Sequence, residues 1–252
     1  MNIEEKRSEP KVAAIVEVRM TSSRLPGKHL LESNGIPMIS RLVRRIKSIE
    51  CIDLVILATT MNQSDDVFVS LAQKEDAVVY RGSESDVMGR VLQAAIHFSV
   101  DIICEITGDC PLIDVDLTKE AIEYFLESEW DYLNNGTTGL PDGLGCQIFS
   151  TKALETSYNL TNRALDFEHV TAHIIRNPLV FRSSYTQVPS WLVWPSLSLS
   201  LDEVADFFLL NEVISAEENT HFLFGARRVI DFLKTRPDLV EINSKVMRRG
   251  YE

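Results

Sequence analysis

Short apolar runs alternate with amphipathic segments through the first half of the chain. The runs are rich in Val, Ile and Ala, which is typical of buried strands, and they cover residues 12–18, 54–59, 77–80 and 102–107. The segments between them repeat apolar residues at helical spacing, and they cover about 37–48, 65–74, 86–98 and 116–128. Such alternation predicts a parallel sheet with helices on both faces, whose ligands bind at the carboxyl ends of the strands.

The pattern changes after Trp130. Turn signals at 134–136 and 141–143 precede further short elements. We expect strands at 147–149, 181–186 and 197–201, and helices near 151–158, 166–176, 203–215 and 227–235. The predicted organisation is a flexible N-terminal tail at 1–11 and a single domain at 12–252, with a small lobe inserted at about 131–196. The aromatic segment 185–196 packs on the core or contacts a second copy, so the lobe is expected to bind an acceptor or to form a homodimer.

Composition limits the classes of partner. The 252 residues carry a formal charge of −12, which argues against general binding to nucleic acid or to anionic membranes. The first residues lack the apolar run of a signal peptide, and no stretch of about 18 apolar residues suggests a spanning helix. We therefore expect a cytoplasmic protein. The four cysteines are scattered, which predicts reduced thiols rather than a disulfide framework or a zinc site.

A basic loop follows the first predicted strand. Residues 19–28 contain Arg19, Arg24 and Lys28 among Ser, Pro and Gly residues, whose backbone N–H groups are free to face an anion. The P-loop template does not fit, because Ser22 replaces its first Gly and His29 replaces its magnesium-binding hydroxyl. A solvated basic loop is the alternative. Three cations in ten residues directly after a strand favour a polyphosphate site.

Two carboxylates each follow a predicted strand. Asp109 and Asp202 could reach one point above the sheet and bind Mg²⁺ together with the phosphates. Taken singly, Asp109 is a turn former and Asp202 a helix N-cap. A clamped triphosphate can be hydrolysed or transferred, and the second lobe favours transfer with release of pyrophosphate.

Several motifs resemble those of the sugar cytidylyltransferases, in the branch typified by spore coat polysaccharide biosynthesis protein F. The resemblance spans nearly the whole chain, and its most specific motifs are the segments 19–28 and 106–114. The others are 58–60, 80–90, 141–144, 168–171, Asp202 and the tail 236–243.

The resemblance implies an α/β, Rossmann-like nucleotidyltransferase fold with three α/β/α layers and a mostly parallel sheet. It implies a Mg²⁺-dependent enzyme that joins CTP to a sugar, often a 3-deoxy-2-ulosonic acid, for cell-surface polysaccharide synthesis. The implied catalytic residues are Arg19, Lys28, Asp109 and Asp202, of which the two aspartates hold the metal. The implied nucleotide-binding residues are Arg19, Ser22, Arg24, Lys28, Ala58, Thr59, Thr60, Arg81, Gly82, Ser83, Arg90, Thr107 and Gly108. The implied acceptor-binding residues are Asp142, Gln147, Glu168 and His169.

The sequence also departs from the family pattern. Glu17 replaces a Gln, Gly145 and Gln147 replace acidic residues, and Ser198 replaces an Arg. These changes leave three hypotheses open: a cytidylyltransferase, a nucleotidyltransferase that uses GTP or UTP, and a catalytically weak nucleotide-binding regulator. For Arg90, four residues after Asp86, a surface ion pair is an equal alternative. For His169 the alternative is a helical histidine bonded to its neighbours.

Overall fold

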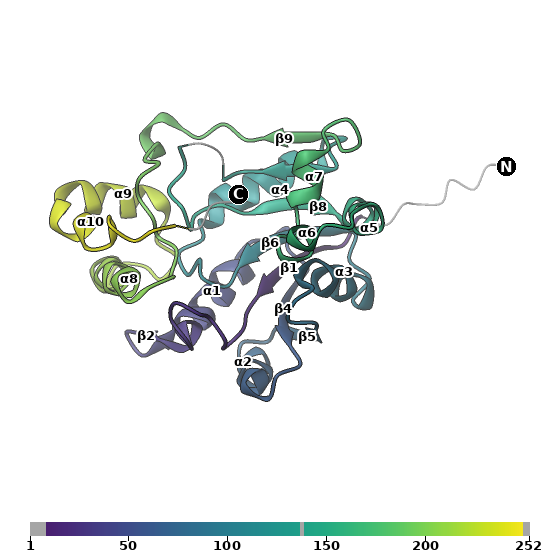
Figure 1. Cartoon of the computed structure of the whole chain (residues 1–252). Helices are drawn as coiled ribbons and strands as arrows, with labels where there is room; N and C mark the ends of the chain where they lie inside the picture. Colours follow the sequence, from purple (N-terminus) through teal and green to yellow (C-terminus); the bar gives the residue numbers. More distant parts are fainter. Residues whose placement is uncertain (1–8, 137–138, 249–252) are drawn as a thin grey trace.

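The computed structural model describes residues 9–136 and 139–248. Its centre is a seven-stranded sheet in the order β5-β4-β1-β6-β8-β7-β9 (Figure 1). The strands are β1 (Val12–Glu17), β4 (Leu54–Thr60), β5 (Val78–Gly82), β6 (Ile102–Thr107), β7 (Tyr132–Asn134), β8 (Gln147–Ser150) and β9 (Ser183–Tyr185). A two-stranded hairpin, β2 (Glu32–Ser33) and β3 (Ile36–Pro37), lies outside this sheet.

The four predicted strands form the parallel half of the sheet. Strand β1 lies between β4 and β6, with Glu17 opposite Ala58 on one side and Thr107 on the other. The other half is mixed, because β8 runs antiparallel to both β6 and β7 while β7 and β9 are parallel. Strands β8, β7 and β9 therefore extend the main sheet beyond β6.

Helices surround the sheet, and side chains cap several of them. Asp86, Asp114 and Ser150 each accept a hydrogen bond from the third residue of the helix that follows, which satisfies an otherwise free N–H group. The helices are α1 (Met38–Lys47), α2 (Asp66–Lys74), α3 (Val87–His97), α4 (Val115–Leu126), α5 (Thr151–Leu160), α6 (Ala164–Glu168), α7 (Ala172–Arg176), α8 (Val204–Glu217), α9 (Ala226–Thr235) and α10 (Pro237–Asn243). Short 3-10 turns cover Lys28–Leu30, Gln63–Asp65 and Ser190–Leu192.

Three apolar clusters make up the core. One packs α1, α2 and α4 on one face of the sheet, and a second packs α3, α5 and α7 on the other. This is the three-layer α/β/α arrangement that the sequence predicted. The third cluster joins α8, α9 and α10, which lie together at one side of the molecule (Figure 1).

Two element predictions were wrong, and three strands and one α-helix were missed. The predicted helix 166–176 is interrupted, because His169 adopts an extended conformation that separates α6 from α7. The predicted strand 197–201 makes only an isolated bridge, in which Ser198 pairs with Asp142. Its alternating leucines are buried in the third cluster without a partner strand. The missed elements are the hairpin, β7 and α10, each seven residues or shorter.

Residues 1–8 of the predicted tail lie outside the described residues. Lys11, at the end of the tail, is fixed: its backbone N–H donates to Asp101 Oδ2 at 2.8 Å and its Nζ donates to the Phe98 carbonyl at 2.8 Å. Within residues 9–136 and 139–248, every helix is too short or too polar to cross a bilayer.

Candidate functional site

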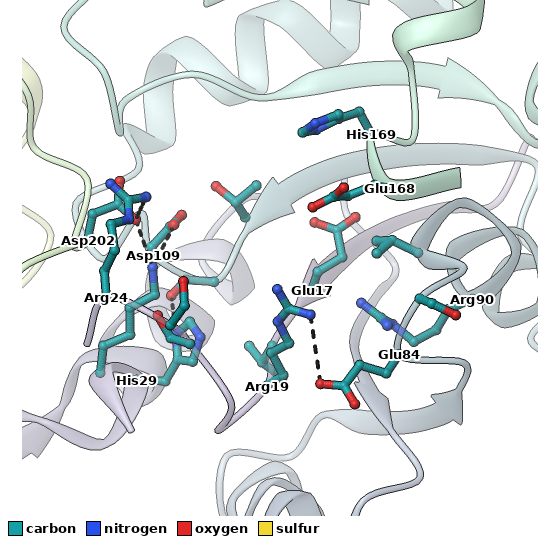
Figure 2. A pocket seen from close by; sticks show the side chains of 18 residues that line it. Glu17, Arg19, Arg24, His29, Glu84, Arg90, Asp109, Glu168, His169 and Asp202 are labelled. Carbon is teal, nitrogen blue, oxygen red and sulfur yellow. Dashed lines mark hydrogen bonds and ion pairs between the residues drawn. The ribbon is translucent and has the colours of Figure 1, made fainter. Parts of the chain in front are cut away.

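A pocket of about 810 Å³ opens where β1 and β6 end (Figure 2). This volume is typical of small-molecule sites. We call it the main pocket, and its lining residues are Glu17, Val18, Arg19, Ser22, Ser23, Arg24, Lys28, His29, Glu84, Ser85, Val87, Arg90, Thr107, Gly108, Asp109, Glu168, His169 and Asp202. It therefore collects most of the residues that the sequence predicted, from segments far apart in the chain.

The basic loop is held in place by its own backbone and by one buried carboxylate. Gly27 adopts a left-handed conformation, with φ of 70°, and its N–H donates to the Met20 carbonyl at 3.1 Å. The Met20 N–H donates to Asp65 Oδ1 at 2.8 Å, while the hydroxyls of Thr59 and Thr60 donate to Asp65 Oδ2. Asp65 thus ties the loop to the end of β4.

Lys28 lies between the two predicted metal ligands. Its Nζ is 3.0 Å from Asp109 Oδ2 and 3.0 Å from Asp202 Oδ1. Arg24 also reaches Asp202 Oδ1, at 2.7 Å. Burial opposes the charge of Lys28, but the two carboxylates outweigh burial and raise the pKa of the ammonium group. Burial likewise acts to raise the pKa of Asp109, but Lys28 outweighs it and the net shift is downward.

A backbone contact brings the two carboxylates together although 93 positions separate them in the chain. The Leu201 N–H donates to the Asp109 carbonyl at 2.7 Å. The next residue, Asp202, donates its own N–H to Asp206 Oδ2 at 2.9 Å. The N-cap of α8 is Glu203, so the capping role that was the alternative for Asp202 is wrong.

The donor set at this point fits a divalent cation. One ammonium group contacts both carboxylates, so a single ion can be reached by oxygens of Asp109 and Asp202 at once. No group of three or more His, Cys, Asp or Glu side chains suited to a metal occurs among residues 9–136 and 139–248. Two carboxylates are nevertheless enough for Mg²⁺ when nucleotide phosphates supply the other oxygens.

Two further arginines line the main pocket. Arg19 is exposed and lies 3.8 Å from Glu84 Oε1 at the rim (Figure 2). Arg90 is buried, and its guanidinium donates to the Ser83 carbonyl. A surface ion pair with Asp86 is therefore excluded for Arg90, since Asp86 instead accepts hydrogen bonds from the Gly89 N–H and the Tyr158 hydroxyl.

The predicted acceptor residues divide between two cavities. Glu168 and His169 line the main pocket on the side opposite Asp202 (Figure 2). Asp142 and Gln147 line a smaller cavity of about 260 Å³, which we call the second cavity. Gln147 Oε1 accepts hydrogen bonds from the Tyr132 and Thr171 hydroxyls, both at 2.6 Å.

Six predicted nucleotide-binding residues do not line the main pocket: Ala58, Thr59, Thr60, Arg81, Gly82 and Ser83. The Arg81 guanidinium donates to the Thr60 and Asn62 carbonyls and pairs with Asp66, so it fastens the ends of β4 and β5. Gly82 lies against Arg90, because an added Cβ would stand 3.0 Å from Arg90 Cγ.

Sequence reasoning missed other lining residues. Glu84, Ser85 and Val87 lie within the motif 80–90, directly after the three residues 81–83 that were assigned to the nucleotide, where the chain leads into α3. His29, another omission, is buried, and its ring Nδ1 lies 3.0 Å from the Gly108 carbonyl. Burial, and then the charge of Lys28, lower the pKa of His29 to about 4, so the neutral ring donates to that carbonyl. The sequence feature that could have identified His29 as a lining residue is its position immediately after Lys28.

Comparison with known proteins gives a consistent result. The family model described as cytidylyltransferase matches residues 13–224. Uncharacterized protein MJ1063 of Methanocaldococcus jannaschii is 33% identical over 244 residues, covering 96% of this chain and 98% of that protein. Spore coat polysaccharide biosynthesis protein SpsF of Bacillus subtilis is 28% identical over 204 residues, covering 77% and 82%. A solved cytidylyltransferase structure from Leptospira borgpetersenii superposes with a TM-score of 0.87 at 26% identity, covering 96% of this chain and 100% of that one.

Proposed function

The chain belongs to the cytidylyltransferase family and is a nucleotidyltransferase, and from this premise we propose that it transfers CMP from CTP to a sugar or sugar acid and releases pyrophosphate. The observation that carries the proposal is the set of cations around Asp109 and Asp202 in one pocket. A 3-deoxy-2-ulosonic acid is the acceptor that the family resemblance suggests, and cell-surface polysaccharide synthesis is the corresponding role.

The basic loop would bind the triphosphate. Arg24 supports this role, because its NH1 is buried beside the pocket without a hydrogen-bond partner while its NH2 pairs with Asp202. Lys28 and Arg19 would neutralise the negative charge that builds up on the departing pyrophosphate as its bond to the α-phosphorus breaks. The acceptor hydroxyl oxygen forms the new bond to the α-phosphorus and releases its proton to solvent, and pyrophosphate leaves with the electron pair of the broken bond.

Asp109 and Asp202 would hold Mg²⁺. When bound, the ion would act as a Lewis acid that stabilises the negative charge developing on the phosphates during transfer. Lys28 would then leave the carboxylates for the phosphates, which lie within the reach of a flexible four-carbon side chain. Burial keeps this exchange away from bulk water, where each interaction would be weaker.

The test compares Asp109→Asn and Asp202→Asn with the matched control Asp116→Asn, an exposed residue of α4. Release of pyrophosphate from CTP is followed with a panel of sugars and sugar acids in Mg²⁺. We expect each site variant to lose turnover by about a hundredfold or more, and the control to keep it. A site variant that folds by circular dichroism and retains near wild-type turnover would remove that residue from the metal site.

A calorimetric titration of CTP, GTP, UTP and ATP, with and without Mg²⁺, tests the choice of base. We expect selective CTP binding that Mg²⁺ strengthens. Tighter binding of GTP or UTP would assign the transfer to that nucleotide instead. Absence of binding to all four would contradict the proposed reaction.

A further inference from the structure

The C-terminal segment 236–248 contacts the part of the chain that carries Asp202. It begins with the tail motif 236–243, most of which forms α10, and its last residues 246–248 have no regular secondary structure. Helix α10 packs with α8 in the third cluster. The segment lies beyond the region that the family model matches, and none of its residues lines the main pocket. Any effect of this segment on the reaction is therefore exerted through other residues.

Asp206, in the first turn of α8, is the centre of this contact. Its side chain is fully buried, and its Oδ2 accepts hydrogen bonds from the N–H groups of Asp202 at 2.9 Å and Glu203 at 2.8 Å. Asn243, the last residue of α10, donates from its Nδ2 to Asp206 Oδ1 and to the Ser198 carbonyl, both at 2.9 Å. The tail motif thus fastens the backbone on the two sides of Asp202.

Arg248 binds the same buried carboxylate with two hydrogen bonds. Its NH2 donates to Asp206 Oδ1 at 2.6 Å and its NH1 donates to Asp206 Oδ2 at 3.0 Å. A guanidinium group that is held by two such bonds has a fixed direction, because it is planar and its donors match the carboxylate. The same NH1 lies 3.6 Å from Asp202 Oδ2. Asp206 therefore fixes a positive charge beside one oxygen of Asp202.

Lys28 and Arg24 hold the other oxygen of this carboxylate. They contact Asp202 Oδ1, whereas Arg248 faces Oδ2. Both line the main pocket, so a bound triphosphate can draw them away, but Arg248 does not line it and stays bonded to Asp206. Among the described residues, Arg248 is then the cation that remains beside Asp202. Mg²⁺ demands near-ideal geometry from its ligands, so a carboxylate that has lost its other partners needs one that keeps its direction.

We propose that Arg248 is a positioning residue for the metal site. Held by Asp206, it keeps the Asp202 carboxylate turned toward the point that the Lys28 ammonium group occupies in this structure, while Lys28 and Arg24 move to the phosphates. This inference rests on the proposed transfer function. It also gives the tail motif a role, because α10 and the residues after it must stay bonded to α8 for Arg248 to act.

Loss of charge and loss of position predict opposite results when Arg248 is replaced. Removal of a cation beside a carboxylate favours, through charge alone, the binding of a divalent cation at that carboxylate. Loss of the fixed orientation weakens the same binding, and partners that orient a metal ligand are worth about 10- to 100-fold in metal affinity. The factor by which Mg²⁺ strengthens CTP binding is therefore a readout that only a positioning role would lower.

The experiment is a calorimetric titration of CTP, with and without Mg²⁺, on the wild type, Arg248→Met, Arg248→Lys and the matched control Arg236→Met. Arg236 is an exposed arginine at the start of α10 that pairs with Asp238. We expect Arg248→Met to reduce the strengthening by Mg²⁺ by about tenfold or more, and to change CTP binding without Mg²⁺ little. Arg248→Lys keeps the charge but cannot form both bonds to Asp206, so it should lose most of the strengthening as well. The control should keep it.

Circular dichroism checks that each variant is folded, and if Arg248→Met does not fold, Arg248→Lys decides by the same criterion. An Mg²⁺ effect that is unchanged or larger in Arg248→Met would overturn the inference and leave the transfer function standing. Full recovery in Arg248→Lys would show that charge suffices, which would also overturn it. If Mg²⁺ does not strengthen CTP binding even in the wild type, the proposed metal site and this inference fail together.

Discussion

Glu17→Gln offers a quantitative test of the buried pair of carboxyl groups that Glu17 and Glu105 form. Burial, opposed in part by Glu105 and Arg90, raises the pKa of Glu17 from 4.5 to about 7 in the folded protein. Between these two values the folded protein keeps a proton that the unfolded chain has released. The folded state then binds more protons, so the free energy of unfolding of the wild type falls as the pH rises through this window.

The size of the effect follows from the two pKa values. Between about pH 5 and pH 8, the wild type should lose about 2.5 kcal/mol of stability relative to Glu17→Gln, in which the group cannot ionise. Glu105 adds to the difference in the same direction, since its own pKa is raised partly by Glu17. His29 acts in the opposite direction in both proteins, because its pKa is lowered from 6.5 to about 4 and its contribution to stability is lost as the pH falls. Comparing wild type with variant cancels that contribution.

The assay is urea unfolding of both proteins at several values from about pH 5 to pH 8, without nucleotide, with the midpoint and the m-value fitted separately. The free energy of unfolding of Glu17→Gln should increase steadily relative to that of the wild type as the pH rises. A difference between the two proteins that stays constant with pH would mean that Glu17 ionises at its ordinary pKa, and the argument about the pair would fail. A changed m-value would instead indicate an altered unfolded or native ensemble.

Three further substitutions test other parts of the site. Lys28→Met should reduce turnover by about a hundredfold, and a CTP titration should show weaker binding than in the wild type, because a phosphate cation is lost. Asp65→Ala should lower the free energy of unfolding by about 3 kcal/mol, measured in urea, since Met20, Thr59 and Thr60 donate to that buried carboxylate. Gly143→Ala should lower the free energy of unfolding more than Gly35→Ala does. Both glycines have positive φ, so the backbone strain is shared. Only at Gly143 would the new Cβ clash with backbone, 2.6 Å from the Leu199 carbonyl carbon, whereas no atom lies within 4 Å of a Cβ at Gly35. Equal loss at both glycines would contradict the steric argument.

The parallel half of the fold could be predicted from the sequence because its strands are buried on both faces. Continuous apolar runs such as 12–16 and 54–58 have few other ways to satisfy both burial and backbone hydrogen bonding. The short strand β7, between β8 and β9, carries no such signal over its three residues. The segment 197–201 was wrongly predicted as a strand for the opposite reason. Its Leu-x-Leu-x-Leu pattern satisfies strand periodicity, but the buried leucines pack against helices and the backbone bonds to Asp142 and Asp109.

The sequence predicted those residues of the candidate site that are charged and closely follow an apolar run. The loop follows β1 and Asp109 follows β6, and the shared edge of a parallel sheet brings such positions together. Asp202 reaches the same point by another route, because the Leu201 N–H donates to the Asp109 carbonyl. The meeting of Glu17 with Glu105 was not predicted, since it depends on the register between β1 and β6. Residues 58–60 and 81–83 were placed near the nucleoside by resemblance to the family motifs. In the structure they do not line the main pocket: Thr59 and Thr60 donate to Asp65, and Arg81 donates to the Thr60 carbonyl.

The charges of the main pocket compensate one another when no ligand is present. Lys28 and Arg24 hold the Asp202 carboxylate, and Lys28 also holds Asp109, so no large desolvation cost accumulates in a buried site. A bound triphosphate with its cation would replace these ion pairs by equivalent ones. The phosphates would pair with Lys28 and Arg24, and Mg²⁺ would pair with the carboxylates of Asp109 and Asp202. The pair of Glu17 and Glu105 is stabilised in a different way: burial raises the pKa of both groups, and their side chains share a hydrogen bond. One buried set of acidic groups is therefore balanced by ion pairs with Lys28 and Arg24, and the adjoining set by retained protons.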